Sequence, residues 1–286
     1  MKERLKELWT EGKRINRAAL KRRTERLLKR EIRYISSFFP YDIKRFHHED
    51  LIYMQAVLLA DSFSGRDAGG VLSSRLVSLI TGLELLSIGT VFHDFNRYGS
   101  CMPAEESAST ERGYTLDLLF GDIFYSRAVI YLLKFRDHEV FDSILEALKK
   151  MHESRLKLHL AMQKALSPGG DTDCISRDKK LLIDANSLLY ISVATGIKIS
   201  GRSRMLKDRK LSNIVEDLLA YKTYSDLLKY LMSPGPSGPS SVLSGCLAKR
   251  AKSIIPEMEG NIAGLKEKDL SQGINMIFDS LKKNHS

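Results

Sequence analysis

The chain has 286 residues, 43% of them hydrophobic, and a formal net charge of +10 at pH 7. This length can bury the core of one large domain or two small ones. No uncharged apolar run approaches the ~20 residues of a membrane-spanning helix, and the charged N-terminus lacks the apolar core of a secretory signal. Its three cysteines are widely spaced, match no zinc or redox pattern and fit a reducing compartment: Cys101, Cys174 and Cys246. We therefore expect a soluble cytoplasmic protein.

Most of the positive charge lies at the N-terminus, where residues 1–35 hold thirteen Lys or Arg and five Glu, a net charge of +8. Leu5 and Leu8 begin a narrow apolar stripe at helical spacing, so we assign residues 1–38 to a basic helical extension of a domain spanning 39–286. Its apolar edge could pack on the domain or on a partner. Alternatively, the segment could lie on an anionic membrane, where each basic residue is worth about 1 kcal/mol. No groove-reading motif accompanies the charge, so we expect no nucleic-acid partner.

Helical periodicity continues through the rest of the chain, and no convincing strand pattern interrupts it. The predicted helices are 51–63, 71–93, 116–135, 138–166, 178–200, 207–232, 242–255 and 261–283. The Ser-Pro-Gly-Gly sequence at 167–170 predicts a sharp helix end. The Pro- and Ser-rich segment 233–241 predicts an exposed loop, and Pro256 predicts a break. In 138–166, one face is expected to be buried: Val140, Ile144, Leu145, Leu148 and Met151. The predicted fold class is all-α.

Polar residues follow the apolar helix 71–93 in an ordered series. The helix ends in His93-Asp94, and a polar loop then carries Arg112-Gly113. The next helix is expected to open on Gly121-Asp122, where Gly121 would permit close helix packing and Asp122 would favour the positive end of the helix dipole. Asp94 could simply cap its helix, and His93 could be a satisfied interface histidine.

A second acidic segment, Asn-Ile-Val-Glu-Asp-Leu-Leu-Ala-Tyr, lies at residues 213–221. Together, these landmarks resemble the two aspartate-rich regions of the trans-isoprenyl diphosphate synthases, and their order and spacing match over roughly residues 45–285. The resemblance implies an isoprenoid-synthase-like helical bundle. Such enzymes ionise an allylic diphosphate with the help of Mg²⁺, a hard cation that prefers carboxylate oxygens. Facing helices supply these carboxylates at positions that share one helical face.

Several of the carboxylates that the resemblance calls for are missing here. Phe95 and Tyr98 stand where the first motif would carry further aspartates, and Arg97 adds a positive charge between them. Ala220 takes the place of the last aspartate of the second motif. The lysine expected on a later helix would fall at about Asp184. We therefore expect no catalytic residue in this chain.

An intact frame with depleted motifs resembles component 1, the small subunit of the two-component heptaprenyl or hexaprenyl diphosphate synthases. This resemblance implies a heterodimer in which a catalytic large subunit holds Mg²⁺ and both substrates, farnesyl and isopentenyl diphosphates, to make a menaquinone or other quinone side chain. The degenerate first motif would be His93, Asp94 and Arg97. Candidate residual contacts to metal or diphosphate would be Arg112, Asp122, Glu216 and Asp217. A pair of acids such as Glu216 and Asp217 is also common on a solvated helix face.

Two alternatives belong to other classes. One is a metal-dependent phosphohydrolase of the His-Asp type that would use His47 or His48 with His93-Asp94. Its signal is only a dipeptide, and adjacent histidines on a helix point in different directions, so the segment around His47 is more simply surface. The other is a basic helical protein that binds a membrane or nucleic acid through residues 1–35.

Overall fold

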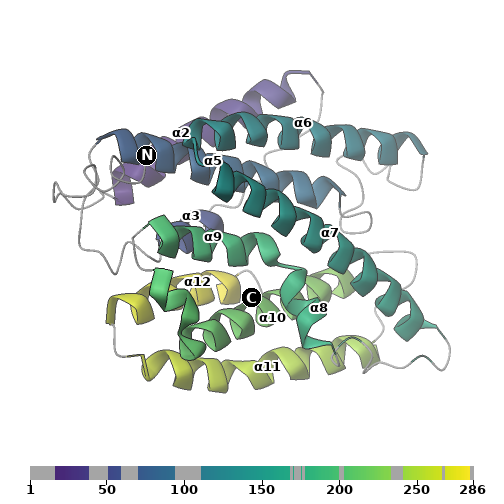
Figure 1. The fold of residues 1–286 in the computed structure, drawn as a ribbon. Coiled ribbons are helices and arrows are strands. Elements are labelled where there is room, and N and C mark those ends of the chain that lie inside the picture. Colours follow the sequence, from purple (N-terminus) through teal and green to yellow (C-terminus); the bar gives the residue numbers. More distant parts are fainter. Residues whose placement is uncertain are drawn as a thin grey trace. The chain divides into compact units, whose positions relative to one another are not determined.

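The computed structural model describes residues 17–38, 51–58, 70–93, 111–167, 170, 175, 178–199, 203–232, 241–265 and 268–283 (Figure 1). Within these residues the secondary structure consists of ten α-helices and one 3-10 helix, without a strand, so the predicted all-α class is confirmed. The chain divides into two compact units, Met1–Phe141 and Asp142–Ser286. Each unit is described by itself.

The first unit is organised around one central helix, α5. Its helices are α2 (Arg17–Ser36), α3 (Ile52–Leu58), α5 (Gly70–His93) and α6 (Glu111–Phe135). Helices α2, α3 and α6 all contact α5, and every residue of α5 from Leu79 to Thr90 is buried. This enclosure explains the almost uninterrupted apolar sequence of α5, because no face of the helix meets water along that stretch.

Glycines bring α5 and α6 close together. A methyl group added at Gly82 would lie 2.7 Å from the side chain of Leu132, and one at Gly89 would lie 2.5 Å from the ring of Tyr125. On α6, a methyl at Gly121 would collide with the ring of His93. Early residues of α5 meet late residues of α6, so the two helices are antiparallel. The predicted role of Gly121 in close packing is confirmed.

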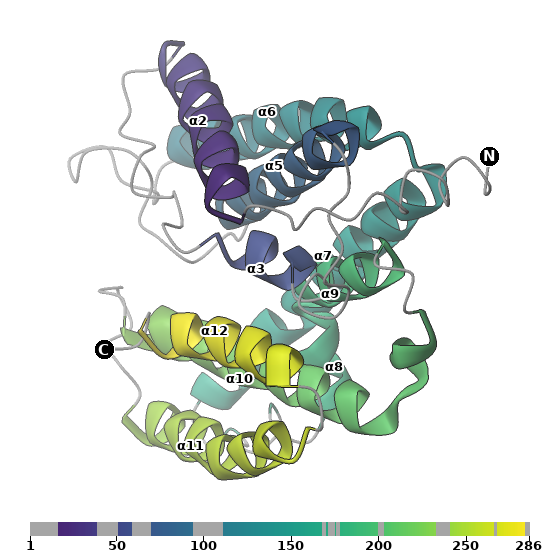
Figure 2. The ribbon, with the colours of Figure 1, turned by 90° about the vertical axis from the view of Figure 1, so that its left-hand side faces the viewer.

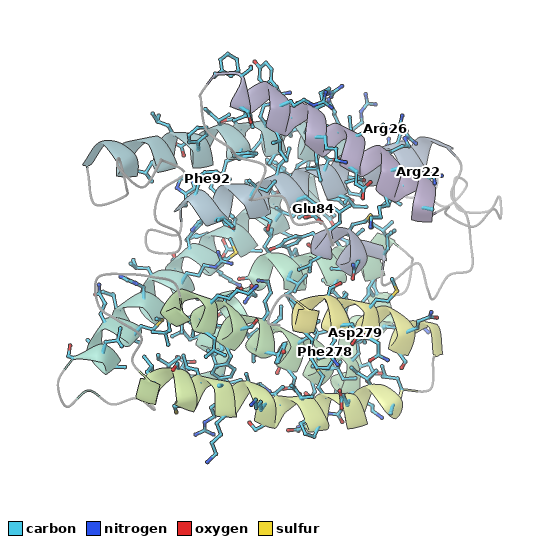
Figure 3. All side chains as sticks on the ribbon, turned by 180° about the vertical axis from the view of Figure 1, so that it is seen from behind. Arg22, Arg26, Glu84, Phe92, Phe278 and Asp279 are labelled. Atoms are coloured by element: carbon cyan, nitrogen blue, oxygen red, sulfur yellow. The ribbon has the colours of Figure 1, made fainter. Side chains whose placement is uncertain are left out.

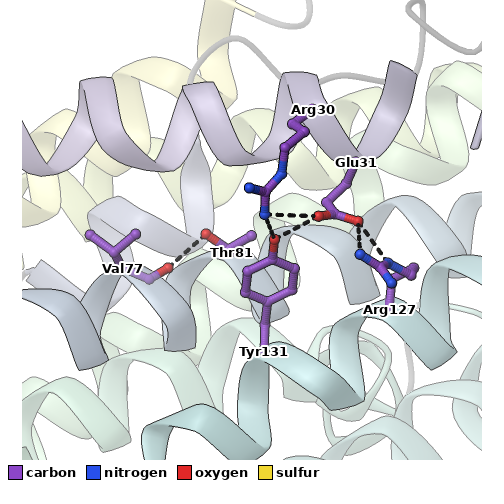
Figure 4. A network of polar contacts seen from close by, with 6 residues as sticks. All are labelled: Arg30, Glu31, Val77, Thr81, Arg127 and Tyr131. Carbon is purple, nitrogen blue, oxygen red and sulfur yellow. Dashed lines mark hydrogen bonds and ion pairs between the residues drawn. The ribbon is translucent and has the colours of Figure 1, made fainter. Parts of the chain in front are cut away.

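A buried carboxylate fastens α2 to α6 (Figure 4). The side chain of Glu31 on α2 is 1% exposed and accepts hydrogen bonds from Arg127 Nε at 2.7 Å and from Tyr131 Oη at 2.6 Å. Arg30 donates to Tyr131 Oη at 2.8 Å. Burial by itself would raise the pKa of Glu31, but the hydrogen bonds from Tyr131 and Arg127 outweigh it and hold the pKa below its ordinary value.

Helix α2 therefore packs on its own unit, as one interpretation of the basic segment predicted. It lies across α5 and α6 (Figure 2). Its inward face is apolar and buried: Leu20, Leu28, Ile32 and Ile35. The sequence predicts a separate extension over residues 1–38. Within that range, α2 shares the core of the first unit, and residues 1–16 lie outside the described residues.

One helix among the described residues is long and apolar enough to cross a membrane by length and composition. It is the 20-residue segment Ser74–His93 within α5. A search of the sequence for uncharged runs does not identify this segment, because Glu84 is the single charge between Leu76 and Phe92. In its most apolar window, 83% of the residues are buried inside the structure. Burial in the core of the unit accounts for this composition.

A two-residue connection joins α6 to α7 (His138–Leu166). Arg136 has a positive φ of 59°, and Asp137 accepts a hydrogen bond from the backbone N–H of Val140 at 3.0 Å, which caps α7. Helix α7 ends at Leu166, as the sequence at 167–170 predicted. Its predicted buried face is partly wrong, since Leu145 is 40% exposed and Leu148 half-buried. Ala147 is buried in their place, one helical turn after Ile144.

The second unit is organised around α10. After α7, its elements are α8 (Lys179–Asp184), α9 (Ser187–Ile199), the 3-10 helix η3 (Ser203–Lys207), α10 (Arg209–Met232), α11 (Ser241–Ala263) and α12 (Lys268–Lys283). Helices α8, α9, α11 and η3 contact α10, and α12 contacts α11. The ammonium of Lys210, at the start of α10, donates to the carbonyl of Gly264 just beyond α11 at 2.6 Å. Helices α10 and α11 are therefore antiparallel.

Two predicted helix boundaries in this unit are wrong. The helix predicted over 178–200 is two helices. The backbone N–H of Asn186 donates to the carbonyl of Ile183 and not to that of Leu182. The carbonyl of Leu182 instead accepts a hydrogen bond from the hydroxyl of Thr223 at 2.6 Å. Pro256 does not separate two helices but lies inside α11. The carbonyl that loses its donor there belongs to Lys252, an exposed position, and water can satisfy it.

Candidate functional site

The first candidate region lies where α5 ends against α6. His93 is the last residue of α5, and its Nε2 lies 3.4 Å from Asp122 Oδ1. The imidazole also stacks on the ring of Tyr125 with centroids 4.8 Å apart, over the space that Gly121 leaves. The structure thus brings two predicted site residues together, and it adds Tyr125 beside them.

Helix α6 begins five residues before the predicted helix range of 116–135 and ten residues before Gly121-Asp122, the pair expected near its opening. It starts at Glu111, so Arg112 and Gly113 lie in its first turn and not in a loop. Asp122 lies three turns further on, too far from the helix N-terminus for the predicted dipole effect, which is confined to the first turn. A single glycine costs about 1 kcal/mol in a helix interior, and a helix of 25 residues tolerates Gly113.

The remaining residues of the first motif lie outside the described residues. These are Asp94 and Arg97, together with the substituted positions Phe95 and Tyr98. The side chain of Arg112 is likewise not described. The same holds for His47 and His48 of the phosphohydrolase alternative, which stays a prediction.

The second candidate region lies on α10, where a lysine contacts both acids. Lys179 is the first residue of α8, and its Nζ lies 3.0 Å from Asp217 Oδ1 and 3.8 Å from Glu216 Oε2. Asp217 is 9% exposed, and Glu216 is half-buried. The carboxylate of Asp178 caps α8 by accepting from Leu181 N–H at 2.9 Å, which fixes the start of the helix and the position of Lys179.

Lys179 is the residue of this region that sequence reasoning missed. The resemblance placed the expected lysine near Asp184, at the other end of α8. The signal that could have found it is the Asp178-Lys179 sequence, a helix cap followed at once by a cation. Ala220, on the same face of α10 as Glu216, is 2% exposed, so the position of the missing acid lies in the core.

The described acids do not fit a Mg²⁺ site. Magnesium requires several oxygen ligands in octahedral geometry and repels other cations. Here the two acids on α10 already face an ammonium group, and Asp122 faces His93. Among the described residues no three His, Cys, Asp or Glu side chains lie close enough to share a metal ion.

A further acid, Glu84, lies in the middle of α5 and was not singled out by its sequence. Its side chain is 2% exposed, and it accepts a hydrogen bond from the backbone N–H of Met54 at 3.1 Å. Burial raises the pKa of Glu84 to about 8, although hydrogen bonds from the backbone of Met54 and Tyr53 partly oppose this rise. Glu84 therefore joins α3 to α5 and has a structural role.

The fold is similar to that of a known structure. A crystal structure of an isoprenoid synthase family member from Thermotoga neapolitana matches with a TM-score of 0.59 and 15% sequence identity, over 92% of this chain and 96% of that chain. No family model matches the sequence, and no curated protein matches it. The all-α arrangement, with ten α-helices among the described residues, thus resembles the isoprenoid synthase fold.

Proposed function

We propose that this chain is the non-catalytic small subunit of a heterodimeric hepta- or hexaprenyl diphosphate synthase. The catalytic partner would hold both complete aspartate motifs, the Mg²⁺ ions, and the farnesyl and isopentenyl diphosphates. The product would serve as the side chain of menaquinone or a related quinone, and the complex would act in the cytoplasm. The similarity to an isoprenoid synthase fold supports this proposal at the level of architecture.

The observation that carries the proposal is the contact of Lys179 with Glu216 and Asp217. In the fold family that the sequence resembles, acids at these positions hold Mg²⁺. Here a side chain of the same chain supplies a positive charge, so one of the two negative charges is offset without a metal. Because Lys179 is part of the chain, it cannot dissociate with a released diphosphate as a metal ion can.

A second observation concerns an exposed apolar stripe on α6. Leu119, Ile130 and Leu133 lie on one face of the helix and are 47%, 42% and 51% exposed. Asp122 and Ser126 are also exposed on this face, between Leu119 and Ile130, so the apolar surface is concentrated at Ile130 and Leu133. Exposed large apolar side chains can mark a surface that contacts another protein chain. The stripe supports a partner subunit and offers a place to test for it.

The activity test is a prenyl transfer assay with farnesyl diphosphate, isopentenyl diphosphate and Mg²⁺. The chain is assayed by itself and mixed with a polyprenyl synthase subunit from the same organism that carries both complete motifs. We expect no product from this chain by itself and a long-chain product from the mixture. Product from the isolated chain would overturn the non-catalytic assignment, and a mixture no more active than its catalytic member would overturn the subunit assignment.

The role of Lys179 is tested by Mn²⁺ binding, measured by electron paramagnetic resonance as a substitute for Mg²⁺. We expect the affinity of the unmodified chain for Mn²⁺ to be no higher than that of an unrelated exposed acidic protein surface. Lys179→Ala should gain affinity, whereas Lys180→Ala, the neighbouring exposed lysine, should not. Tight Mn²⁺ binding by the unmodified chain would contradict the proposed replacement of a metal by Lys179.

The partner surface is tested by assembly of the two subunits. Leu119→Gln, Ile130→Gln and Leu133→Gln combined should weaken the complex at least tenfold in analytical ultracentrifugation. The three substitutions remove apolar contact area, and a loss of about 1.4 kcal/mol corresponds to a tenfold weaker complex. The matched control replaces three exposed leucines of α7, Leu145→Gln, Leu156→Gln and Leu160→Gln. Equal weakening by both variants would remove α6 as the specific contact.

A further inference from the structure

The outer face of α2 carries a stripe of basic side chains. Arg22, Arg26, Lys29 and Arg33 follow one another at helical spacing, and all four are exposed. Figure 3 shows Arg22 and Arg26 on the outer edge of α2. The stripe extends for three turns of the helix, so its charges lie along one line and can act together on an extended anionic surface.

These four cations have no acidic partners among the described residues. Arg26 Nε donates to the carbonyl of Arg22 at 3.3 Å, and Arg33 Nε donates to the carbonyl of Lys29 at 3.4 Å, so both bond only to the backbone of their own helix. The acids of α2 are engaged elsewhere. Glu25 pairs with Lys21 at 3.8 Å, and Glu31 points into the unit. The positive field of the outer face is thus not cancelled locally.

Two aromatic side chains stand exposed where α2 ends. Tyr34 and Phe38 are 50% and 60% exposed, and their rings meet edge to face at 5.0 Å. Arg127 lies over the ring of Tyr34 at 5.2 Å. Aromatic side chains next to basic residues are frequent at membrane interfaces, because their rings suit the boundary between headgroups and acyl chains.

The apolar face of α2 is already occupied. Leu28, Ile32 and Ile35 are buried in the first unit, and Glu31 is bonded to Arg127 and Tyr131. An amphipathic helix that inserts into a membrane must bury its apolar face in lipid. For α2 this would mean leaving the core and exposing the bonded carboxylate, so contact with a membrane must use the basic outer face while α2 stays packed.

We propose that the outer face of α2, with Tyr34 and Phe38 at its end, binds the surface of an anionic membrane. The headgroup phosphates would meet Arg22, Arg26, Lys29 and Arg33, and the two rings would reach the headgroup layer. A fluid lipid surface can adjust its charges to a straight row of cations without a matching shape. This proposal depends on the charges of α2 and is independent of the proposed enzyme subunit role.

The test is co-sedimentation of the full chain with vesicles of equal parts phosphatidylglycerol and phosphatidylcholine, compared with phosphatidylcholine only. We expect binding to the anionic vesicles at about 0.05 M salt and its loss at about 0.5 M, where charges are screened within a few ångströms. The combined substitution Arg22→Gln, Arg26→Gln, Lys29→Gln and Arg33→Gln should weaken binding at least about 100-fold, since each cation contributes about fivefold.

A matched control removes the same charge from another helix. Lys149→Gln, Lys150→Gln, Lys157→Gln and Lys164→Gln replace four exposed lysines of α7 and should weaken binding less than about tenfold, because charges away from the contact act only over a Debye length. Tyr34→Ser with Phe38→Ser should weaken binding about tenfold without changing its salt dependence. Far-ultraviolet circular dichroism confirms that each variant remains helical.

Three results would overturn the proposal. The first is an absence of binding to anionic vesicles at low salt. The second is an equal loss of binding in the α2 and α7 variants, which would show an effect of net charge only. The third is binding to a single-stranded RNA that persists at about 0.15 M salt, depends on the four α2 cations and exceeds vesicle binding, which would identify nucleic acid as the ligand.

Discussion

The two units are each organised around a helix that is buried along most of its length, α5 in the first and α10 in the second. Both helices carry an acid in the core, and the two acids have different partners. Glu84 on α5 accepts from the backbone N–H of Met54, whereas Asp217 on α10 faces the ammonium of Lys179. A buried carboxylate can be accommodated by binding a proton or by facing a cation, and this chain uses both solutions.

The first unit also contains Glu31, which makes the comparison sharper. Glu31 and Glu84 are buried to almost the same extent, but Glu31 meets Arg127 and Tyr131. The pKa of Glu31 is held below its ordinary value, while burial raises that of Glu84 to about 8. The partners of a carboxylate, and not burial by itself, decide its protonation state.

The largest effect is expected for Glu84→Gln. The folded state holds the proton of Glu84 up to a pKa of about 8, above the ordinary glutamate value of 4.5. The contribution of this group to stability is therefore fully present below pH 4.5 and is lost as the pH rises towards 8, by up to about 1.4 kcal/mol per pH unit. Glutamine keeps an acceptor for Met54 without a charge, so the variant should be more stable at pH 7 by about 3 kcal/mol.

Urea unfolding of wild type and Glu84→Gln at pH 5 and pH 7.5 measures this difference. The two proteins should differ by less than about 1 kcal/mol at pH 5 and by more than about 3 kcal/mol at pH 7.5. If the gap were the same at both pH values, the protonation of Glu84 would not be coupled to folding.

The next effect in size is expected for Glu31→Gln, with the opposite sign. The substitution removes a charge that Arg127 and Tyr131 both contact, and it leaves a guanidinium in a partly buried site. Removing one member of a buried ion pair costs 3–5 kcal/mol, and because the Arg127 side chain is 31% exposed we expect about 2–3 kcal/mol. Since the pKa of Glu31 is lowered, this stability is present above pH 4.5 and is lost as the pH falls. A loss at pH 7 no larger than at pH 3 would contradict the argument.

A third prediction compares the same substitution in the two units. Gly121→Ala places a methyl group into the ring of His93 and should destabilise the first unit by about 1 kcal/mol, because the imidazole must leave its stacked position on Tyr125. Gly260→Ala on α11 meets no atom within 4 Å and should stabilise the second unit by about 0.5–1 kcal/mol, since alanine favours the helix more than glycine does. Thermal unfolding of both variants tests the difference in sign.

Most helices could be predicted from the sequence, because each has an apolar face that repeats with helical spacing. In α7, for example, Val140, Ile144 and Met151 are buried as expected. The errors arose where contacts distant in sequence decide the structure. The break at Asn186 depends on Thr223, 37 residues away, and no local pattern around residue 186 indicates it.

The candidate site was less accessible to sequence reasoning for the same reason. The resemblance identified Glu216 and Asp217 but could not show that α8 brings Lys179 to them, since this contact spans 38 residues. It identified His93 and Asp122 separately, and their contact follows from the antiparallel packing of α5 and α6. Glu84 carried no motif at all, because its role depends on the N-terminal turn of α3.

The smallest effect is expected for Lys179→Met, and it completes the comparison of the acids. The Asp217 side chain is only 13% exposed, but that of Lys179 is 56% exposed, so water screens this pair more than it screens the site of Glu31. We expect a loss of less than about 1 kcal/mol, and no change for Lys180→Met, the adjacent exposed lysine of α8. Urea unfolding measures both. A loss as large as that of Glu31→Gln would mean that Lys179 stabilises α10 in the way that Arg127 stabilises α2, and its role would then be structural. A small loss would show that α10 stays folded without Lys179. The Mn²⁺ experiment on Lys179→Ala requires this.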